Sequence, residues 1–397
     1  NIFENFSTGI LSDSKKTRVL EGVYSPGTYI PENPDQSRVN PHLLCIWLKP
    51  YKIKHSNHIS VGITVYNAVT NHSHILEFDV KDDKMHITTL DEVQHVLSIY
   101  QPKEVILISP YENTEAYIPL LSTTYVHHYS PELTMIKNAE KQRHCDYILN
   151  KHFAADALSQ CMEFSEFPLA TQSFVVLIHF LEEHNPSLCK KLALPHWGNH
   201  KKYVKCANRS LLQLNIIDDN NTQFSRIKRF NQKSYSSVCS LLNRCRTNMG
   251  SRLFYHKITH PIYDSTALEA EYAIMEKWIE DPLQYVVVQN LHPSFSKIHD
   301  IDHLARLLHI QKLQPPELAK LFSSVSIAEQ VWSCLAETQW MHNYVPLDRP
   351  FHEIHQSMQE WLHYLEKRIN MTMCARYNNN SNYPTTQEES LLNTTVF

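Results

Sequence analysis

The hydrophobic period of this sequence changes near residue 150, and that change constrains the fold more than any other feature. Between residues 43 and 110, apolar side chains alternate or form short runs, as in HLLCIWLK, ISVGITVYN and HILEFDV. These segments are rich in β-branched residues and predict three strands. The segment LDEVQHVLSIY predicts a helix, and EVILIS at residues 104–109 predicts a strand buried on both faces. We therefore expect an α/β domain first.

Beyond residue 150, the apolar residues recur at helical spacing. The first stripe consists of Phe174, Leu177, Ile178 and Leu181. Later stripes are Leu304, Leu307 and Leu308, then Leu318, Leu321, Phe322 and Val325 behind Pro315 and Pro316, and finally Ile354, Met358, Trp361 and Leu365. This part of the chain is predicted to be all-α.

Composition excludes several classes of protein. With 397 residues, 42% hydrophobic and 20% charged, the chain is large enough for two or three globular domains. It contains no run of 18 apolar residues and no signal-peptide pattern, so we expect an intracellular protein without a membrane span. The net charge of −4 does not favour a free-standing DNA-binding domain. The nine cysteines form no C-x-x-C pair and are expected to be reduced, and we expect no metal site at the histidine pairs HKITH and HEIH.

One segment carries a family signature. Residues 242–264, LNRCRTNMGSRLFYHKITHPIYD, resemble the T-x-T-x-M-G-x-R-L…P-[IL]-x-D motif of the MutS family of DNA mismatch-recognition ATPases. The matching residues are Thr247, Met249, Gly250, Arg252, Leu253, Pro261 and Asp264. We predict that they are structural. Gly250 is one of only six glycines, and it is expected either to need a positive φ or to have a neighbour too close for a Cβ.

Other segments resemble the same family in the same order. RVLEGVYSPGTYIP resembles the stretch that enters the connector domain of MutS proteins, and QPKEVILISP resembles the family's R-P-x-E-[IV]-[IL] segment. ATQSFVVLIHFLEEHNPSL resembles the first helix of the core domain. ANRSLLQLNII follows, with Ser210 and Asn215 where the family has Thr and Glu. The last line is FSKIHDIDHLARLLHIQKLQPPELAKLFSSV, which keeps Asp300 and Asp302 but has His303 in place of an arginine.

The resemblance implies a domain plan. Residues 1–42 would be a linker from the end of a mismatch-reading domain, and residues 43–150 a ribonuclease-H-like α/β connector domain. Residues 151–374 would form the helical core and lever domain, and residues 375–397 a polar loop and lever segment leading to a missing clamp. The mismatch-reading, clamp and ATPase domains are expected to lie outside this chain.

The implied function is to couple ATP state to the binding of mismatched duplex DNA. ATP and Mg²⁺ are implied for the full-length protein only, and we predict no catalytic, cofactor or metal site in these residues. The spacing of Gly22 and Gly27 fits a phosphate-binding loop, but Thr28 stands where that loop needs lysine. The resemblance also implies a dimer when complete and a possible MutL-like partner at the connector domain.

Two other functions remain open. A ribonuclease-H-like sheet can carry metal-binding carboxylates for phosphodiester cleavage, and Glu77 and Asp79 are the candidates on one strand face. A helical protein-interaction scaffold without a DNA role is the second alternative. Internal repeats of 30–45 residues would favour the scaffold, and the sequence contains none.

Overall fold

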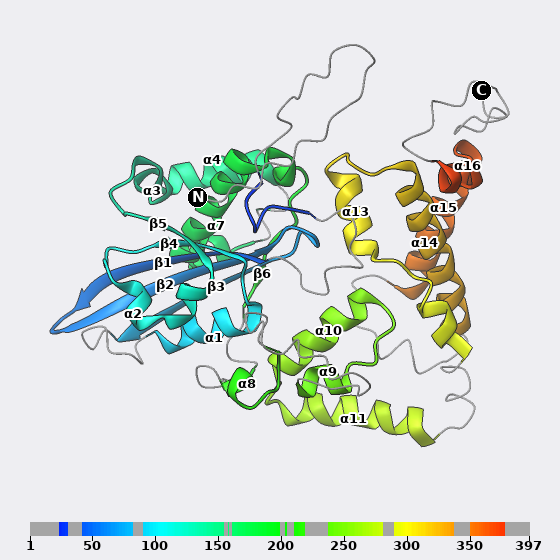
Figure 1. The fold of residues 1–397 in the computed structure, drawn as a ribbon, viewed down its shortest axis with the longest axis horizontal. Helices are drawn as coiled ribbons and strands as arrows, with labels where there is room; N and C mark the ends of the chain where they lie inside the picture. Colours follow the sequence, from blue (N-terminus) through cyan, green and yellow to red (C-terminus); the bar gives the residue numbers. More distant parts are fainter. Residues whose placement is uncertain are drawn as a thin grey trace, which may run out of the picture. The chain divides into compact units, whose positions relative to one another are not determined.

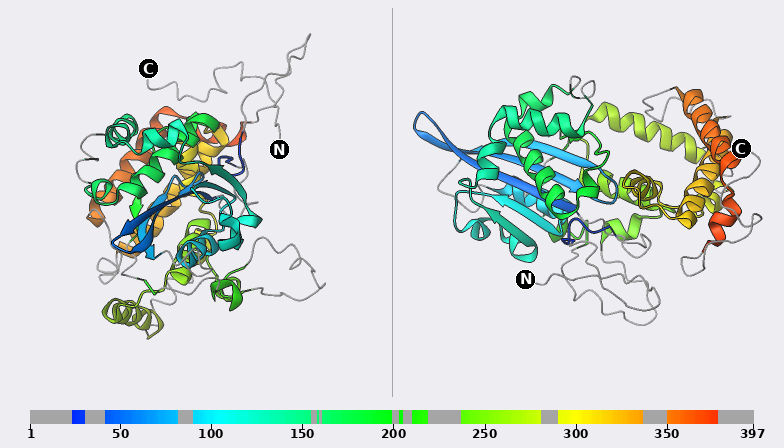
Figure 2. Two further views of the ribbon diagram at one scale, coloured as in Figure 1. Left: turned by 90° about the vertical axis from the view of Figure 1, so that its left-hand side faces the viewer. Right: turned by 90° about the horizontal axis from the view of Figure 1, so that it is seen from above.

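The structure, a computed structural model, divides into two compact units, Asn1–Leu242 and Asn243–Phe397 (Figures 1 and 2). The residues that it describes are 24–30, 42–81, 90–154, 158, 161–198, 203–204, 210–218, 237–280, 290–336 and 350–377. Among them, no helix is both long and apolar enough to cross a membrane.

The first unit is built on a mixed six-stranded sheet in the order β5-β4-β1-β2-β3-β6. Its strands are β1 (His42–Ile53), β2 (Ser56–Asn67), β3 (Ser73–Lys81), β4 (Glu104–Ile108), β5 (Tyr125–Tyr129) and β6 (His196–Trp197). Strand β2 is antiparallel to β1 and β3, whereas β4 runs parallel to both β1 and β5, and β6 runs parallel to β3. Helix α1 (Asp91–Tyr100) precedes β4 in the chain. The predictions of strands β1 to β4 and of α1 are confirmed, whereas β5 and β6 were not predicted.

Each face of the sheet has its own hydrophobic core. Alternate residues of β1 separate cleanly, with Leu44 and Ile46 in the core that includes α1 residues, and Cys45 and Trp47 in the opposite core. All five residues of β4 are buried, and its four apolar residues contribute to the two cores in turn, so the predicted double-sided burial of this strand is confirmed.

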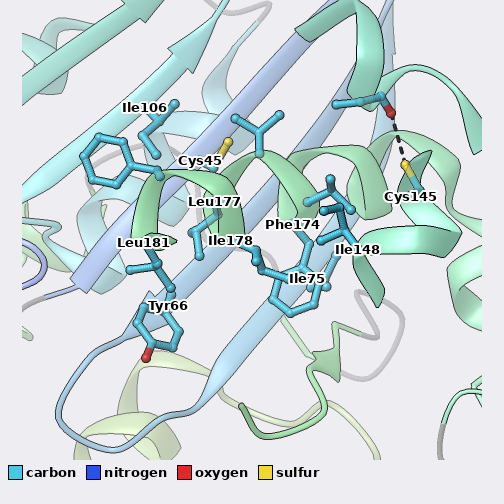
Figure 3. Close-up of a cluster of buried hydrophobic side chains, with 14 of the residues drawn as sticks. Cys45, Tyr66, Ile75, Ile106, Cys145, Ile148, Phe174, Leu177, Ile178 and Leu181 are labelled. Atoms are coloured by element: carbon cyan, nitrogen blue, oxygen red, sulfur yellow. Dashed lines mark hydrogen bonds between the residues drawn. The ribbon is translucent and has the colours of Figure 1, made fainter. Parts of the chain in front are cut away.

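Helix α7 (Pro168–His184) covers the core that contains Cys45. The predicted stripe is buried there, and Figure 3 shows Phe174, Leu177, Ile178 and Leu181 beside Cys45. The helix lies so close to β2 that a Cβ on Gly62 would stand 2.6 Å from the carbonyl oxygen of Leu169.

We expected the helical domain to begin at residue 151. The structure instead packs α7 into the unit of the sheet, against α4 (Gln142–His152) at the end of the predicted connector domain, and β6 joins the sheet itself. Helical periodicity predicts that one face of a segment is buried, but it does not tell which element covers that face. The remaining short elements of this unit are α2 (Thr114–Tyr117), η2 (Pro119–Thr123), α3 (Thr134–Ala139), α6 (Glu163–Glu166), η3 (Pro186–Cys189), α8 (Ser210–Gln213) and α9 (Val238–Leu242).

The described elements of the second unit are helices, as predicted. They are α10 (Asn248–Thr259), α11 (Ser265–Glu280), α13 (Ile301–His309), α14 (Pro315–Ala336), α15 (Phe351–Arg368) and α16 (Met371–Arg376). Helix α14 contacts α13, α15 and α16, and its Leu321 is buried as its stripe predicts. The stripe of α13 was wrong at one position, because Leu304 and Leu307 are buried but Leu308 is 46% exposed.

Candidate functional site

The signature residue Arg252 forms an ion-pair cluster with two aspartates near the start of helix α13. Its Nη1 donates to Asp300 Oδ2 at 2.6 Å, and its Nη2 donates to Asp300 Oδ1 at 2.8 Å. Nη2 also donates to Asp302 Oδ2 at 2.6 Å. We call these three residues the Arg252 cluster. The cluster joins the signature segment, residues 242–264, to the segment that contains Asp300 and Asp302, and each of these segments resembles the MutS family on its own.

Asp300 has a second structural role, because it is the N-cap of α13. Its side chain accepts a hydrogen bond of 3.4 Å from the backbone N–H of His303. Its side chain is only 4% exposed. Burial alone would raise the pKa of this carboxyl, but the hydrogen bonds and charge of Arg252 outweigh burial and hold the pKa below its ordinary value. Asp300 is therefore ionised and paired at neutral pH.

Thr247 and Gly250 form the beginning of α10. Thr247 is the N-cap, and its Oγ1 accepts from the backbone N–H of Gly250 at 3.0 Å. No described glycine has a positive φ, so the positive-φ alternative for Gly250 was wrong. A Cβ at this position would lie 3.0 Å from Thr247 Oγ1, tighter than ordinary contact, so the close-neighbour alternative holds and the neighbour is the cap itself.

The remaining signature residues are not members of the Arg252 cluster. Asp264 precedes α11, and its Oδ1 accepts from the backbone N–H of Thr266 at 3.0 Å, in the manner of an N-cap. Leu253 is 61% exposed, and Met249 and Pro261 are half-buried. The signature thus supplies two helix starts and one ion-pair cluster, rather than one converging pocket.

A second pair of family segments meets at Glu104, at the start of β4. Its carboxylate accepts from Ser25 Oγ at 2.6 Å and from the backbone N–H of Gly27 at 2.9 Å, and it contacts His127 Nε2 at 2.6 Å. Burial would raise the pKa of Glu104, but these hydrogen bonds lower it below its ordinary value. The described residues 24–30 of the predicted linker are therefore fastened to the sheet. Glu104 was visible in the sequence within QPKEVILISP, but its partners were not.

The nuclease candidates Glu77 and Asp79 are engaged in other contacts. Glu77 Oε2 accepts from the backbone N–H of Ala170 at 2.8 Å, in the first turn of α7. Asp79 is exposed and hydrogen-bonded to the hydroxyl of Tyr51. Each carboxylate thus has a structural partner. This favours a structural role for Glu77 and Asp79 over a role as catalytic, metal-binding carboxylates.

The histidine pairs also make helix contacts. The rings of His256 and His260 stack at 4.2 Å between centroids, and His355 Nε2 contacts Glu329 Oε1 at 2.8 Å. Within the described ranges, no group of three or more His, Cys, Asp or Glu side chains is arranged to hold a metal ion. All eight described cysteines are free thiols.

Comparison with known proteins places this geometry in a family. Residues 209–384, which contain the whole Arg252 cluster, match the model of MutS domain III. A putative DNA mismatch repair protein of Acanthamoeba polyphaga mimivirus, MutS homologue L359, is 24% identical over 381 residues, covering 86% of this chain and 32% of that protein. Residues 209–384 are thus a MutS domain III, and most of the chain is similar to MutS-family DNA mismatch repair proteins.

Bacterial MutS proteins are similar over much of the same chain. The DNA mismatch repair protein MutS of Petrotoga mobilis is 22% identical over 342 residues, 85% of this chain and 36% of that protein. MutS of Clostridioides difficile is 18% identical over 306 residues, 76% of this chain and 28% of that protein. The chain spans about a third of the length of these MutS relatives.

Proposed function

We propose that this chain is the connecting part of a MutS-type mismatch-repair protein, transmitting ATP state to a grip on mismatched duplex DNA. ATP and Mg²⁺ would be bound by other parts of that protein. The sheet unit would be the connector domain with a ribonuclease-H-like fold. Support for that fold comes from the strand order β3-β2-β1-β4-β5, in which β4 and β5 run parallel to β1 and the first three strands are antiparallel.

The Arg252 cluster is the observation that carries the proposal. Coupling between two distant sites can be carried by ion-pair networks and rigid secondary-structure elements. A planar guanidinium bonded to both oxygens of Asp300 fixes direction as well as distance, which a single point charge does not do. The cluster therefore ties α10 and α13 into one stiff piece within the residues that match MutS domain III.

The partners follow from the same proposal. Mismatched duplex DNA would be the substrate of the complete protein, which would act as a dimer. A MutL-like protein is the partner proposed for the connector domain.

The test uses the complete protein that contains this chain. Binding to matched and mismatched duplexes would be measured with and without ATP, for the natural protein and for Arg252→Lys. We expect Arg252→Lys to keep mismatch binding without nucleotide but to weaken the response to ATP.

The matched control is Lys257→Ala, on the same helix. Lys257 forms an exposed ion pair with Glu271 at 3.0 Å, so the variant loses a charge on α10 without touching the Arg252 cluster. An Arg252→Lys protein with an unchanged ATP response would remove the support from this cluster. No mismatch preference in the natural protein would overturn the proposed function as a whole.

A further inference from the structure

The hairpin formed by β1 and β2 extends beyond the rest of its sheet. Strand β4 pairs with β1 only from Leu43 to Trp47, and β3 pairs with β2 only from His58 to Tyr66. The distal part of the hairpin, residues 49–58, therefore has few strand neighbours, and it projects from the sheet in Figure 1. We call residues 49–58 the hairpin arm.

The hairpin arm lies in a stretch of one charge sign. Residues 42–76 contain no aspartate or glutamate, although the whole chain has 41 acidic residues against 37 lysines and arginines. Lys49 pairs with Glu140 at 2.8 Å. Lys52 and Lys54 are exposed, and no ion pair or side-chain hydrogen bond engages them in the described part of the chain. Among the described residues, the arm thus presents two positive charges that no ion pair compensates.

The acidic neighbours of the arm include Glu140, which pairs with Lys49, and Asp79 of β3. The Asp79 carboxylate is hydrogen-bonded to the hydroxyl of Tyr51. Asp82 and Asp83 follow β3 in the sequence and lie outside the described residues.

Uncharged groups on the arm also suit a nucleic acid. Tyr51 and His58 are opposite each other in register, and their rings stack at 5.5 Å and 28°. Ile53 beside them is 50% exposed. Pro50 has no N–H, and Lys49 precedes it. Proline and lysine at a sheet edge both disfavour pairing with a further strand. The chemistry that the arm offers a partner is therefore that of its side chains.

We propose that the hairpin arm contacts the phosphate backbone of duplex DNA, with Lys52 and Lys54 neutralising phosphates. The inference rests on the proposed function, because duplex DNA is the polyanion that this function brings to the protein. Phosphate contacts fix orientation on a duplex without reading its sequence. The arm would then orient the sheet unit beside DNA that another part of the protein recognises.

The test compares the 397-residue chain with its Lys52→Ala/Lys54→Ala variant, by titration of labelled duplex DNA at several salt concentrations. Each neutralised phosphate contributes about 0.9 to the slope of log affinity against log salt, so the double variant should lose about 1–2 of that slope. At low salt, the affinity should fall by at least about fivefold. The melting temperature should not change, because both lysines are exposed and no described residue forms an ion pair with them.

The matched control is Lys103→Ala/Arg143→Ala, which removes the same charge from exposed positions of the same unit. An equal loss of affinity in this control would show that net charge, not the arm, governs binding, and would overturn the proposal. The proposal would also be overturned if the natural chain did not bind duplex DNA. It would be overturned as well if poly-glutamate competed with duplex DNA equally well, because the arm would then be assigned to an acidic protein. None of these results bears on ATP-dependent mismatch binding by the complete protein, so the two proposals fail separately.

Discussion

Arg252 and Asp300 are 48 residues apart in the sequence, yet their side chains meet through two hydrogen bonds of 2.6 and 2.8 Å. The aspartate is nearly fully buried and caps α13, whereas the arginine extends from α10. The arginine therefore pairs with the buried charge of Asp300. Because Asp300 also caps α13, the same contact fixes the start of α13 relative to α10. A residue with these roles would be expected in a family signature even if it never touched a ligand.

Replacing Arg252 should destabilise the helical unit. Arg252→Ala leaves the Asp300 carboxylate buried without its partner, and breaking such pairs costs about 3 kcal/mol or more. Urea denaturation of the natural chain and the variant measures this loss. Lys257→Ala, which breaks an exposed pair on the same helix, should cost less than about 1 kcal/mol. Equal losses in the two variants would mean that the Arg252 cluster has no special structural role.

The cap at the start of α10 predicts an unusual double-mutant cycle. Thr247→Ala removes the cap and should cost about 1 kcal/mol. Gly250→Ala should also destabilise the natural chain, because the new Cβ would lie 3.0 Å from the capping oxygen. In the Thr247→Ala background that oxygen is gone, so Gly250→Ala should instead stabilise by about 0.5–1 kcal/mol. Thermal melts of the four proteins test the sign change, and an alanine that stabilises in both backgrounds would rule out the close-neighbour role of Gly250.

Local patterns predicted much of the fold. Strands β1 to β3 followed from hydrophobic alternation or short apolar runs, β4 from an apolar run and α1 from a helical stretch, whereas α13, α14 and α15 followed from apolar stripes at helical spacing. Strand β6 has only two residues, too few for any period, and β5, YVHHY, has polar residues at its centre. Neither strand could be recognised from its own sequence, because pairing with a neighbour is what defines them.

The sequence identified the residues of the site but not the residues that they contact. The motif identified Thr247, Arg252 and Asp264, but helix capping and ion pairing depend on where other helices pack. Asp300 and Asp302 were noted on a separate line of the resemblance, and nothing in either line indicated that they bind Arg252. Likewise, the stripe of α7 was recognised while its partner, the sheet, was not.

Gly62 should be among the least replaceable residues of the sheet unit. In Gly62→Ala, the Cβ would meet the backbone of Leu169 at 2.6 Å, and a backbone atom is not free to rotate away. The helix α7 must shift, and overpacking of this kind should cost about 3 kcal/mol in the free energy of unfolding. Gly198→Ala is the control, because its Cβ would meet a methyl group of the Leu76 side chain, which has other rotamers. Denaturant titrations should therefore show a much larger loss for Gly62→Ala, and similar losses would contradict the backbone explanation.

His42 should make the sheet unit sensitive to mild acid. Burial lowers the pKa of His42 from 6.5 to about 4, despite a backbone hydrogen bond at Tyr100 that opposes the shift. In the unfolded chain His42 therefore becomes protonated below about pH 6.5, whereas in the folded chain it stays neutral down to about pH 4. Stability should fall as the pH falls through this window, by up to about 3 kcal/mol from this residue. Unfolding at pH 7 and pH 5 should show a smaller difference for His42→Gln than for the natural chain, and an equal difference would exclude His42 as a source.

The last prediction concerns what this chain alone does with DNA. We expect the 397-residue chain to bind matched and mismatched duplexes with the same low affinity. The chain carries a net charge of −4, and the contacts proposed for the hairpin arm are to phosphates, which are the same in both duplexes. The salt dependence should be shallow because few phosphates are neutralised. Titrating both duplexes at two salt concentrations, with and without Mg²⁺, measures this. A clear preference for the mismatch would place recognition residues within these 397 positions, and Mg²⁺-dependent cleavage would return Glu77 and Asp79 to consideration as catalytic carboxylates.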